Sequence, residues 1–319
     1  MTIPMATLVS ADEYKDILNN FFLGVSPDLS YIPDPSLEDY ILAACLSNGV
    51  ANEKANQISK HGASVAQQFY PLHKFEIQRL VGLFSAYFFA VDDLGLDFVD
   101  DIRKFGRKTM QGDPQPPLLE AFAALLPQFN QHYPDICSNK IATGLINFMD
   151  ASAIEFETTG KFLHLETAAS FPRYFRIMTG LAEPYTFFIL TNDLWSEENI
   201  NLFIQAAPDI MDLTDTINDL LSFYKESIVG DERNNYVYHR ALSDCIRVSD
   251  VLHRLVEENT ARIDNVKATV SESPALLQMV DAYIRGFVGF HVMRPRYKLN
   301  ELEIPSLRNI IDQRMTKGI

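Results

Sequence analysis

The sequence has few cysteines and no long apolar run, and each shortage excludes a class of protein. Only Cys45, Cys137 and Cys245 occur in 319 residues, and no two of them have the C-x-x-C spacing of a structural zinc site. Such sparse cysteine usage is typical of a reducing compartment. No stretch reaches the roughly 18 uninterrupted apolar residues of a membrane helix, and the N-terminus lacks a secretory leader pattern. We therefore expect a soluble protein with a cytoplasmic location.

Basic residues are also scarce. The chain has 27 Lys and Arg against 42 Asp and Glu, which gives a formal net charge of -15. A surface of this sign repels nucleic-acid backbones and anionic membranes, so we expect neither as a partner. A small polyanion is still compatible with this charge if metal ions hold it locally.

The alternation of apolar and polar residues that marks a half-buried strand is missing. Segments with a period instead repeat apolar residues at i, i+3, i+4 and i+7, which predicts an all-α protein. The chain is 47% hydrophobic and shows no repeat and no long linker, so we expect residues 10–319 to form a single-domain helical bundle after a flexible N-terminal tail, residues 1–9. The predicted helices are residues 36–58, 74–93, 99–111, 117–131, 138–160, 167–191, 196–206, 208–229, 244–270 and 274–295.

A first polar cluster follows an aromatic helix in the stretch "FFAVDDLGLDFVDD". Asp92 and Asp93 close the helix, where its macrodipole opposes negative charge, and carboxylates at the end of a buried run are costly unless a cation meets them. Asp100 and Asp101 have a simpler interpretation, because they can cap the helix that begins at Ile102. The pair at 92 and 93 is therefore the better candidate for a cation site.

A second polar cluster lies in "NDLLSFYKE". Asn218, Ser222 and Glu226 are four residues apart, so they stay on one face over roughly 12 Å of helix. Carboxamide, hydroxyl and carboxylate oxygens are the hard ligands that Mg²⁺ prefers. The alternative is a solvated helix face, but the residues between them are largely apolar and place the rest of the helix in the core.

These two motifs resemble those of class I terpene cyclases. "NDLLSFYKE" is most similar to the fungal sesquiterpene cyclases of the trichodiene synthase type, and "FPRYFRIMTGLAEP" and "RYKL" support the likeness, which spans roughly residues 80–300. The resemblance implies a helical bundle with a central apolar cavity and three Mg²⁺ ions. In it Asp92, supported by Asp93, would hold two of the ions, and Asn218, Ser222 and Glu226 would hold the third.

The same resemblance implies a diphosphate site. Arg176 takes the position of the family's diphosphate sensor, and Lys225, Arg296 and Tyr297 match its other diphosphate contacts. Metal ions with Arg and Lys donors are the groups that neutralise a leaving diphosphate in a dry site. Thr179 and Gly180 fall where such cyclases have a helix break that responds to diphosphate, and glycine relaxes the backbone there.

The sequence departs from the family pattern at two places. The third acidic residue of the first motif is Asp97, five positions after Asp92 rather than three or four. Near the C-terminus, Arg294 and Pro295 stand where trichodiene synthase has Asp-Arg. The resemblance therefore does not extend to the product or to Asp97 as a ligand.

The implied reaction is ionisation of an allylic diphosphate, preferably farnesyl diphosphate, and cyclisation of the carbocation to a sesquiterpene hydrocarbon or alcohol. Two alternatives stay open: a chain-elongating prenyl transferase, which would have a second aspartate-rich motif instead of Asn, Ser and Glu, and a non-catalytic helical binding protein. A homodimer is possible, as in related cyclases. Aromatic faces stabilise cations by about 0.5–2 kcal/mol each, and the candidates to line the pocket are Phe88, Phe89, Tyr185, Phe187, Phe287, Phe290 and His291.

Overall fold

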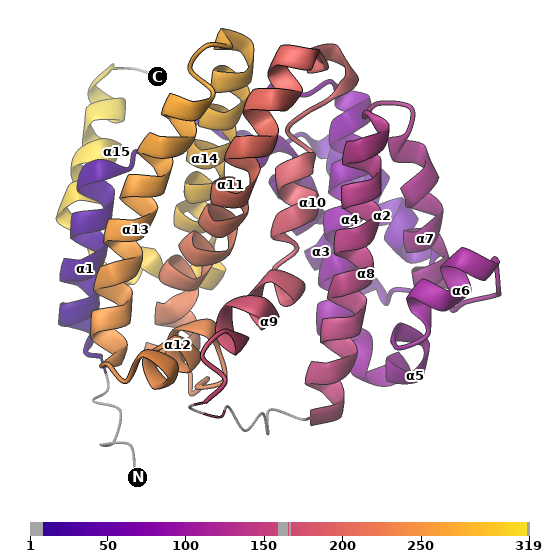
Figure 1. The fold of residues 1–319 in the computed structure, drawn as a ribbon, viewed down its shortest axis with the longest axis horizontal. Coiled ribbons are helices and arrows are strands. Elements are labelled where there is room, and N and C mark those ends of the chain that lie inside the picture. Colours follow the sequence, from indigo (N-terminus) through magenta and orange to yellow (C-terminus); the bar gives the residue numbers. More distant parts are fainter. Residues whose placement is uncertain (1–8, 159–164, 166, 318–319) are drawn as a thin grey trace.

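The computed structural model describes residues 9–158, 165 and 167–317, and every regular element in these ranges is a helix (Figure 1). The all-α prediction is therefore confirmed. Of the predicted tail, residues 1–8 lie outside the described residues, whereas Val9 is buried. The treatment of residues 10–319 as one domain stays a prediction. No helix in the described part of the chain is both long and apolar enough to cross a membrane.

The first helices include one that the sequence did not reveal. Ser10 begins α1 by accepting a hydrogen bond from the backbone N–H of Glu13. The single helix predicted over residues 36–58 is wrong, because Gly49 takes a left-handed φ of 85° and separates two helices. The elements of this part are α1 (Ala11–Gly24), α2 (Pro35–Ser47), α3 (Asn52–Phe69) and α4 (Phe75–Leu94).

The next segment confirms the predicted helix over residues 117–131, which ends two residues earlier, and the one over residues 138–160, which begins three residues earlier; residues 159 and 160 lie outside the described residues. The predicted helix 99–111 is interrupted after Ile102, so it forms two short pieces. The elements are η1 (Gly95–Phe98), α5 (Val99–Ile102), α6 (Phe105–Gln111), α7 (Pro117–Phe129) and α8 (Asp135–Thr158).

The central helices differ most from the prediction. Residues 167–191 form not one helix but α9 (Phe171–Thr179) and α10 (Ala182–Phe187), followed by η2 (Asn192–Leu194). Residues 196–206 and 208–229, predicted as two helices, form one long α11 (Glu197–Phe223) with Pro208 inside it. Its last turn is a π-helix, η3 (Tyr224–Ile228). Packing of α11 against α10, α13 and α14 compensates for the hydrogen bond that the proline removes.

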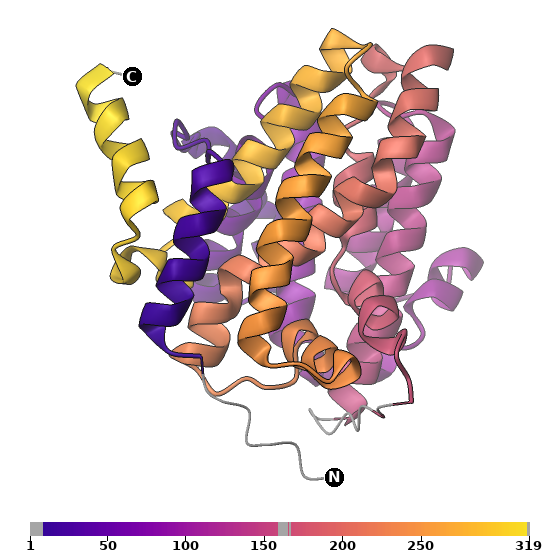
Figure 2. The same cartoon turned by 60° about the vertical axis from the view of Figure 1, so that its left-hand side comes forward.

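The last third of the chain completes the bundle. The predicted helix 244–270 begins at Val248, and a short helix precedes it. The elements are α12 (Tyr236–Asp244), α13 (Val248–Thr269), α14 (Pro274–Met293), η4 (Pro295–Tyr297), η5 (Leu299–Leu302) and α15 (Pro305–Lys317). Figure 2 shows α15 beside α1, outside the main bundle, and Ser306 hydrogen-bonds to Asn19 across this contact.

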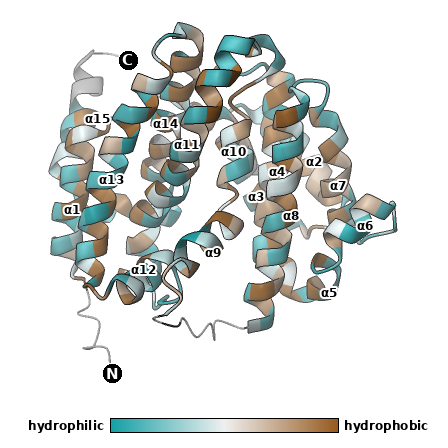
Figure 3. Cartoon of the chain, in the orientation of Figure 1, coloured by the Kyte–Doolittle hydropathy of each residue, from teal (hydrophilic) through white to brown (hydrophobic). Residues whose placement is uncertain are grey.

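The arrangement gathers helix ends at one opening. The carboxyl ends of α4, α8, α11 and α14 lie at the lower end of the bundle in Figure 1, where α9 and α12 also lie. The apolar faces of the helices turn mainly inward and the polar ones outward, as the hydropathy colouring of Figure 3 shows. Four helix C-termini disfavour negative charge at this opening, so carboxylates placed there favour the approach of a cation.

Candidate active site

An apolar cavity of about 160 Å³ lies inside the bundle at this end. Six of the predicted pocket residues line it, namely Phe88, Phe89, Tyr185, Phe287, Phe290 and His291. Val65 and Phe69 of α3 also line it; sequence reasoning missed both, because nothing in their helix marks one face for a cavity. The placement predicted for Phe187 is wrong: it is buried and packs against Phe203 of α11, with ring centroids 5.5 Å apart.

A polar cavity of about 170 Å³ adjoins the apolar one. Arg176, Thr179 and Asn218 line both cavities, so their side chains mark the boundary between a polar and an apolar half. Glu226 lines the polar half. This is the shape expected for a ligand with a charged head and a hydrocarbon tail.

The motif at 218 to 226 begins at this boundary. Asn218 accepts a hydrogen bond at Oδ1 from Arg176 Nη2, at 3.2 Å. Ser222 is buried, and its Oγ has no hydrogen-bond partner, although it lines neither cavity. The π-turn then places the carboxylate of Glu226 at 2.9 Å from Nζ of Lys225. Single π-turns within α-helices are frequent at functional sites.

The aspartates at the end of α4 differ from each other. Asp93 forms an ion pair with Lys54 at 2.9 Å, so it has a cationic partner already. Asp92 is exposed at the opening where the helix ends gather, termed the mouth, and it lines neither cavity, but the protein around it still displaces part of its water. This desolvation, and next the charge of Asp93, raise the pKa of Asp92 above its ordinary value. Asp97 is exposed in η1, and nothing places it with the other acids.

The two predicted motifs share one opening. Besides Asp93, the groups whose charge acts on Asp92 include Arg296, Lys225 and Glu226. Lys225 Nζ lies 5.4 Å and the Arg296 guanidinium 5.7 Å from the ring centroid of Tyr297. The sequence-predicted metal and diphosphate residues of α4, η3 and η4 therefore lie within electrostatic reach of one another, although Lys225 and Arg296, like Asp92, line neither cavity.

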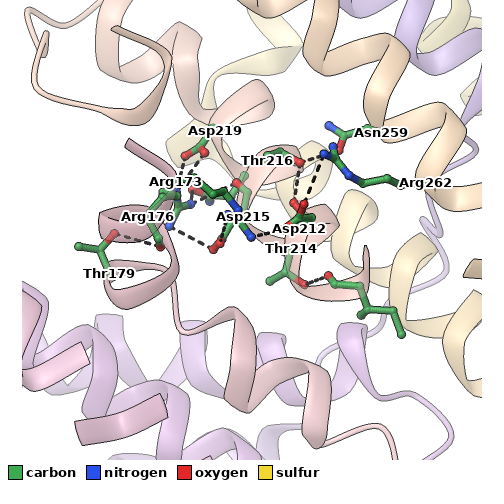
Figure 4. A network of polar contacts seen from close by, with 12 residues as sticks. Arg173, Arg176, Thr179, Asp212, Thr214, Asp215, Thr216, Asp219, Asn259 and Arg262 are labelled. Atoms are coloured by element: carbon green, nitrogen blue, oxygen red, sulfur yellow. Dashed lines mark hydrogen bonds and ion pairs between the residues drawn. The ribbon is translucent and has the colours of Figure 1, made fainter. Parts of the chain in front are cut away.

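Arg176 belongs to a network of charges that the sequence reasoning missed (Figure 4). Its Nε donates to both carboxylate oxygens of Asp219, at 2.8 and 3.0 Å, and its Nη1 lies 3.4 Å from Asp215. Arg173 pairs with Asp215 at 2.8 Å and also with Asp212. Burial, and next Asp215 and Glu226, raise the pKa of Asp219 to about 7 against the opposing effect of Arg176. The network fixes the guanidinium of Arg176 at the cavity boundary.

The break between α9 and α10 has a different cause from the one expected. Gly180 has an ordinary right-handed φ of -85°, and the left-handed residue is Leu181, with a φ of 51°. Glycine is required at 180 for space, because a Cβ there would overlap Asp215 and Arg176. Pro184 has no N–H, so the carbonyl of Gly180 lacks its usual partner four residues ahead. Gly180 lines the apolar cavity.

Two further carboxylates, Glu155 and Glu232, line the polar cavity. Desolvation raises the pKa of each to about 7, with Asp92 next for Glu155 and Glu226 next for Glu232. No sequence signal identified them, because each reads as an ordinary acidic residue at a helix end or in a loop. The mouth is consequently richer in carboxylates than the sequence motifs indicate.

The residues present fit magnesium. The described residues contain no group of three or more His, Cys, Asp and Glu side chains that could hold a metal ion. Asn218 and Ser222, however, supply ligands of other types, and the unpartnered hydroxyl of Ser222 has an unused acceptor. A donor set of oxygens alone suits Mg²⁺ rather than zinc.

The helical bundle and its two-part site are those of a class I terpene synthase. The chain belongs to the trichodiene synthase (TRI5) family, whose profile matches residues 60–310. The sequence-based recognition of a class I terpene cyclase of the sesquiterpene type, a lyase, is confirmed at this level. Terpene synthases bind prenyl diphosphates and generally use Mg²⁺.

Relatives cover nearly the whole chain. An (E)-beta farnesene synthase from Metarhizium brunneum is 31% identical over 303 residues, which are 92% of this chain and 90% of the relative. An alpha-cuprenene synthase from Coprinopsis cinerea is 29% identical over 91% of this chain and 90% of its own. Among solved structures, a linalool/nerolidol synthase from Streptomyces clavuligerus has a TM-score of 0.64 at 14% identity, covering 84% of this chain and 96% of that one. That structural likeness shows the shared fold.

Proposed function

We propose that this terpene synthase ionises farnesyl diphosphate and cyclises the carbocation to a sesquiterpene hydrocarbon or alcohol, with release of diphosphate. The observation that carries the proposal is the joined cavity. Its polar half adjoins Arg176 and Glu226, and its apolar half is walled by aromatic rings. A prenyl diphosphate has the same division between a charged head and an apolar tail.

Asp92, Asn218, Ser222 and Glu226 would hold the magnesium, with Asp93 supporting Asp92. Three bound Mg²⁺ ions, the number implied by the family resemblance, would supply Lewis-acid charge that stabilises the leaving diphosphate. The carboxylates at the mouth carry negative charge that would attract metal ions. Lys54 and Lys225 neutralise only part of this charge.

The chain's own cations would contact the diphosphate directly. Arg176, Lys225 and Arg296, with the hydroxyl of Tyr297, are the proposed donors, and charge-assisted bonds to phosphate are the strong class of hydrogen bond. Arg176 is held by acidic residues in the present arrangement. A diphosphate oxygen therefore competes with Asp219 for its guanidinium. Thr179 and Gly180 also line the apolar cavity. A movement of Arg176 on diphosphate binding would therefore be transmitted to that cavity through these two residues.

The apolar half would shape the product. Eight aromatic or histidine side chains present faces and edges that exclude water and stabilise positive charge by about 0.5–2 kcal/mol per favourable face. The carbonyl of Gly180, freed by Pro184, is proposed to point partial negative charge toward the reacting carbon.

Incubation with C10, C15 and C20 prenyl diphosphates and Mg²⁺, followed by mass spectrometry of a hexane extract, tests the proposal. The expected result is a C15 hydrocarbon or alcohol formed preferentially from farnesyl diphosphate. A parallel incubation with isopentenyl diphosphate tests chain elongation, and a longer prenyl diphosphate as product would contradict the cyclase. Absence of any product at all chain lengths would favour the non-catalytic binding protein.

Two properties expected from the sequence stay predictions. The cytoplasmic location is tested by cell fractionation. The possible homodimer is tested by analytical ultracentrifugation of the purified chain.

A further inference from the structure

We propose that His291 is a positioning residue for Asn218: it fixes which atom of the Asn218 carboxamide faces the diphosphate and metal side of the site. The inference rests on the proposed function, because it concerns Asn218 as a metal ligand. His291 lies on α14, on the opposite side of Asn218 from Arg176.

The carboxamide of Asn218 is held between two side chains. Its Oδ1 lies 3.2 Å from Arg176 Nη2, and its Nδ2 lies 3.1 Å from His291 Nε2. The other ring nitrogen of His291, Nδ1, lies 2.8 Å from the carbonyl oxygen of Phe287. One continuous chain of hydrogen bonds thus joins α14, α11 and α9.

The groups at the two ends of this series of hydrogen bonds, a guanidinium and a carbonyl, determine where each of its protons lies. A guanidinium only donates, so the Asn218 atom that faces Arg176 must be the oxygen. The NH₂ group then faces His291 and donates to Nε2, which must be unprotonated. A carbonyl only accepts, so the proton of the imidazole lies on Nδ1 and is donated to Phe287. The neutral Nδ1–H tautomer is the one that satisfies all three contacts.

The imidazole has little freedom to turn away from this arrangement. His291 is 1% exposed. Its ring centroid lies 4.5 Å from that of Tyr297 and 4.8 Å from that of Phe287. Its backbone hydrogen bond is to a residue one turn earlier in the same rigid helix. The acceptor at Nε2 is therefore presented in a fixed direction.

This arrangement determines which atom of Asn218 is available to a cation. With NH₂ held by His291, Oδ1 is on the polar side of the site beside Arg176. A flipped carboxamide would place its NH₂ there, where it would repel a cation and oppose the donors of Arg176. Partners that orient a metal ligand in this way typically contribute about 10–100-fold in metal affinity.

The test compares three variants by thermal unfolding with Mg²⁺ titrated at a fixed concentration of inorganic diphosphate, which requires no turnover. His291→Leu removes the acceptor and should raise the Mg²⁺ concentration for the half-maximal Tm increase by about 10–100-fold. His291→Gln keeps a terminal oxygen at similar reach and should remain within about threefold of wild type. His253→Leu, at an exposed position on α13, is the matched control and should match wild type.

Asn218→Ala distinguishes a failure of the proposed role of His291 from a failure of the proposed function. If it loses the Mg²⁺-dependent shift while His291→Leu keeps it at wild-type concentrations, the role of His291 is wrong and the proposed function stands. If Asn218→Ala itself keeps the shift, the metal assignment of Asn218 fails, and the inference fails with it.

A measurement on the wild-type protein covers the case in which His291→Leu does not fold. The ¹⁵N shifts of the imidazole distinguish its tautomers in the ligand-free enzyme. A protonated Nδ1 and an unprotonated Nε2 support the assignment. A proton on Nε2 overturns it, because Asn218 would then have to accept from His291 and present its NH₂ to Arg176.

Discussion

Gly180 packs directly against the carboxylate of Asp215, so closely that a Cβ at position 180 would overlap Oδ1 and the guanidinium of Arg176. Because Asp215 is fully buried on α11, neither group can move into solvent. The break between α9 and α10 is thus tied sterically to the charge network that holds Arg176. A change at position 180 should act on catalysis through Arg176.

Gly180→Ala should displace the Arg176–Asp215 pair. We expect turnover of farnesyl diphosphate to fall by at least about 10-fold, with a loss of about 1–3 kcal/mol in the free energy of unfolding from overpacking. Steady-state kinetics and denaturant unfolding measure the two effects. Gly24→Ala is the control, since a Cβ there makes ordinary contact with Thr260 at 3.5 Å. Unchanged turnover in Gly180→Ala would contradict the steric link.

Asp215→Asn should destabilise the ligand-free enzyme. Asp215 has no exposed surface and pairs with both Arg173 and Arg176, so its loss leaves buried cations partly unpaired, at a cost of about 3–5 kcal/mol. The exposed pair of Arg247 and Asp250 gives the control: Asp250→Asn should lower the free energy of unfolding far less, because solvent screens this pair. The free energy of unfolding of both variants is measured in urea. Equal losses would show that the buried ion pairs contribute no more to stability than the exposed pair.

Much of the fold was predictable because long apolar stripes of helical period leave few alternatives. The errors occurred where tertiary contacts override local signals. Pro208 lies inside α11 although proline usually ends a helix, and Leu181 adopts a left-handed conformation that no propensity favours. The boundary between α2 and α3 at Gly49 had a local signal, namely a glycine after Ser-Asn.

Spacing alone made the site predictable only where its residues share one helix, whereas Arg176, Arg296 and Tyr297 were assigned through the family resemblance. The spacing of Asn218, Ser222 and Glu226 marks a polar stripe, and the same helix carries Asp212 and Asp215, whose spacing matches that of Arg173 and Arg176 on α9. That complementary pattern could have indicated the network. Glu155 and Glu232 join the site through the meeting of distant segments, which leaves no trace in sequence spacing.

The carboxylates at the mouth predict a pH-dependent stability. The folded-state pKa values of Glu155 and Glu232, about 7, lie above the ordinary 4.5. The folded enzyme therefore keeps protons that the unfolded chain releases, and their contribution is complete below about pH 4.5 and is lost as the pH rises to about 7. The free energy of unfolding without metal should fall over this window. Both residues are exposed, so solvent screening reduces the effect.

Denaturant unfolding of the double variant Glu155→Gln and Glu232→Gln, in the presence of a chelator, checks this prediction. Its stability should depend less on pH than that of wild type over the same window. Glu257→Gln, at an exposed site on α13, should keep the wild-type slope. A double variant with the wild-type slope would show that these carboxylates do not titrate as expected.

Phe88 and Phe187 should differ in their effect on product. Phe88 lines the apolar cavity and packs on Phe89 and Phe148, whereas Phe187 packs on Phe203 away from it. We expect Phe88→Leu to shift the ratios of terpene products by at least about twofold through altered cavity shape. Phe187→Leu should lower stability by about 1–3 kcal/mol and leave the ratios unchanged. Gas chromatography of the products of both variants measures these ratios. A Phe88→Leu product profile identical to that of wild type would show that Phe88 does not shape the product.

The central claim is that Glu226, whose charge acts on Asp92, works with Asn218 and Ser222 to hold the metal that releases diphosphate. The most direct measurement is the rate of diphosphate release from farnesyl diphosphate at saturating Mg²⁺, in wild type and in Glu226→Ala. The expected loss is at least about 100-fold, with an unchanged helical circular dichroism spectrum. A variant that releases diphosphate within about twofold of the wild-type rate would contradict it.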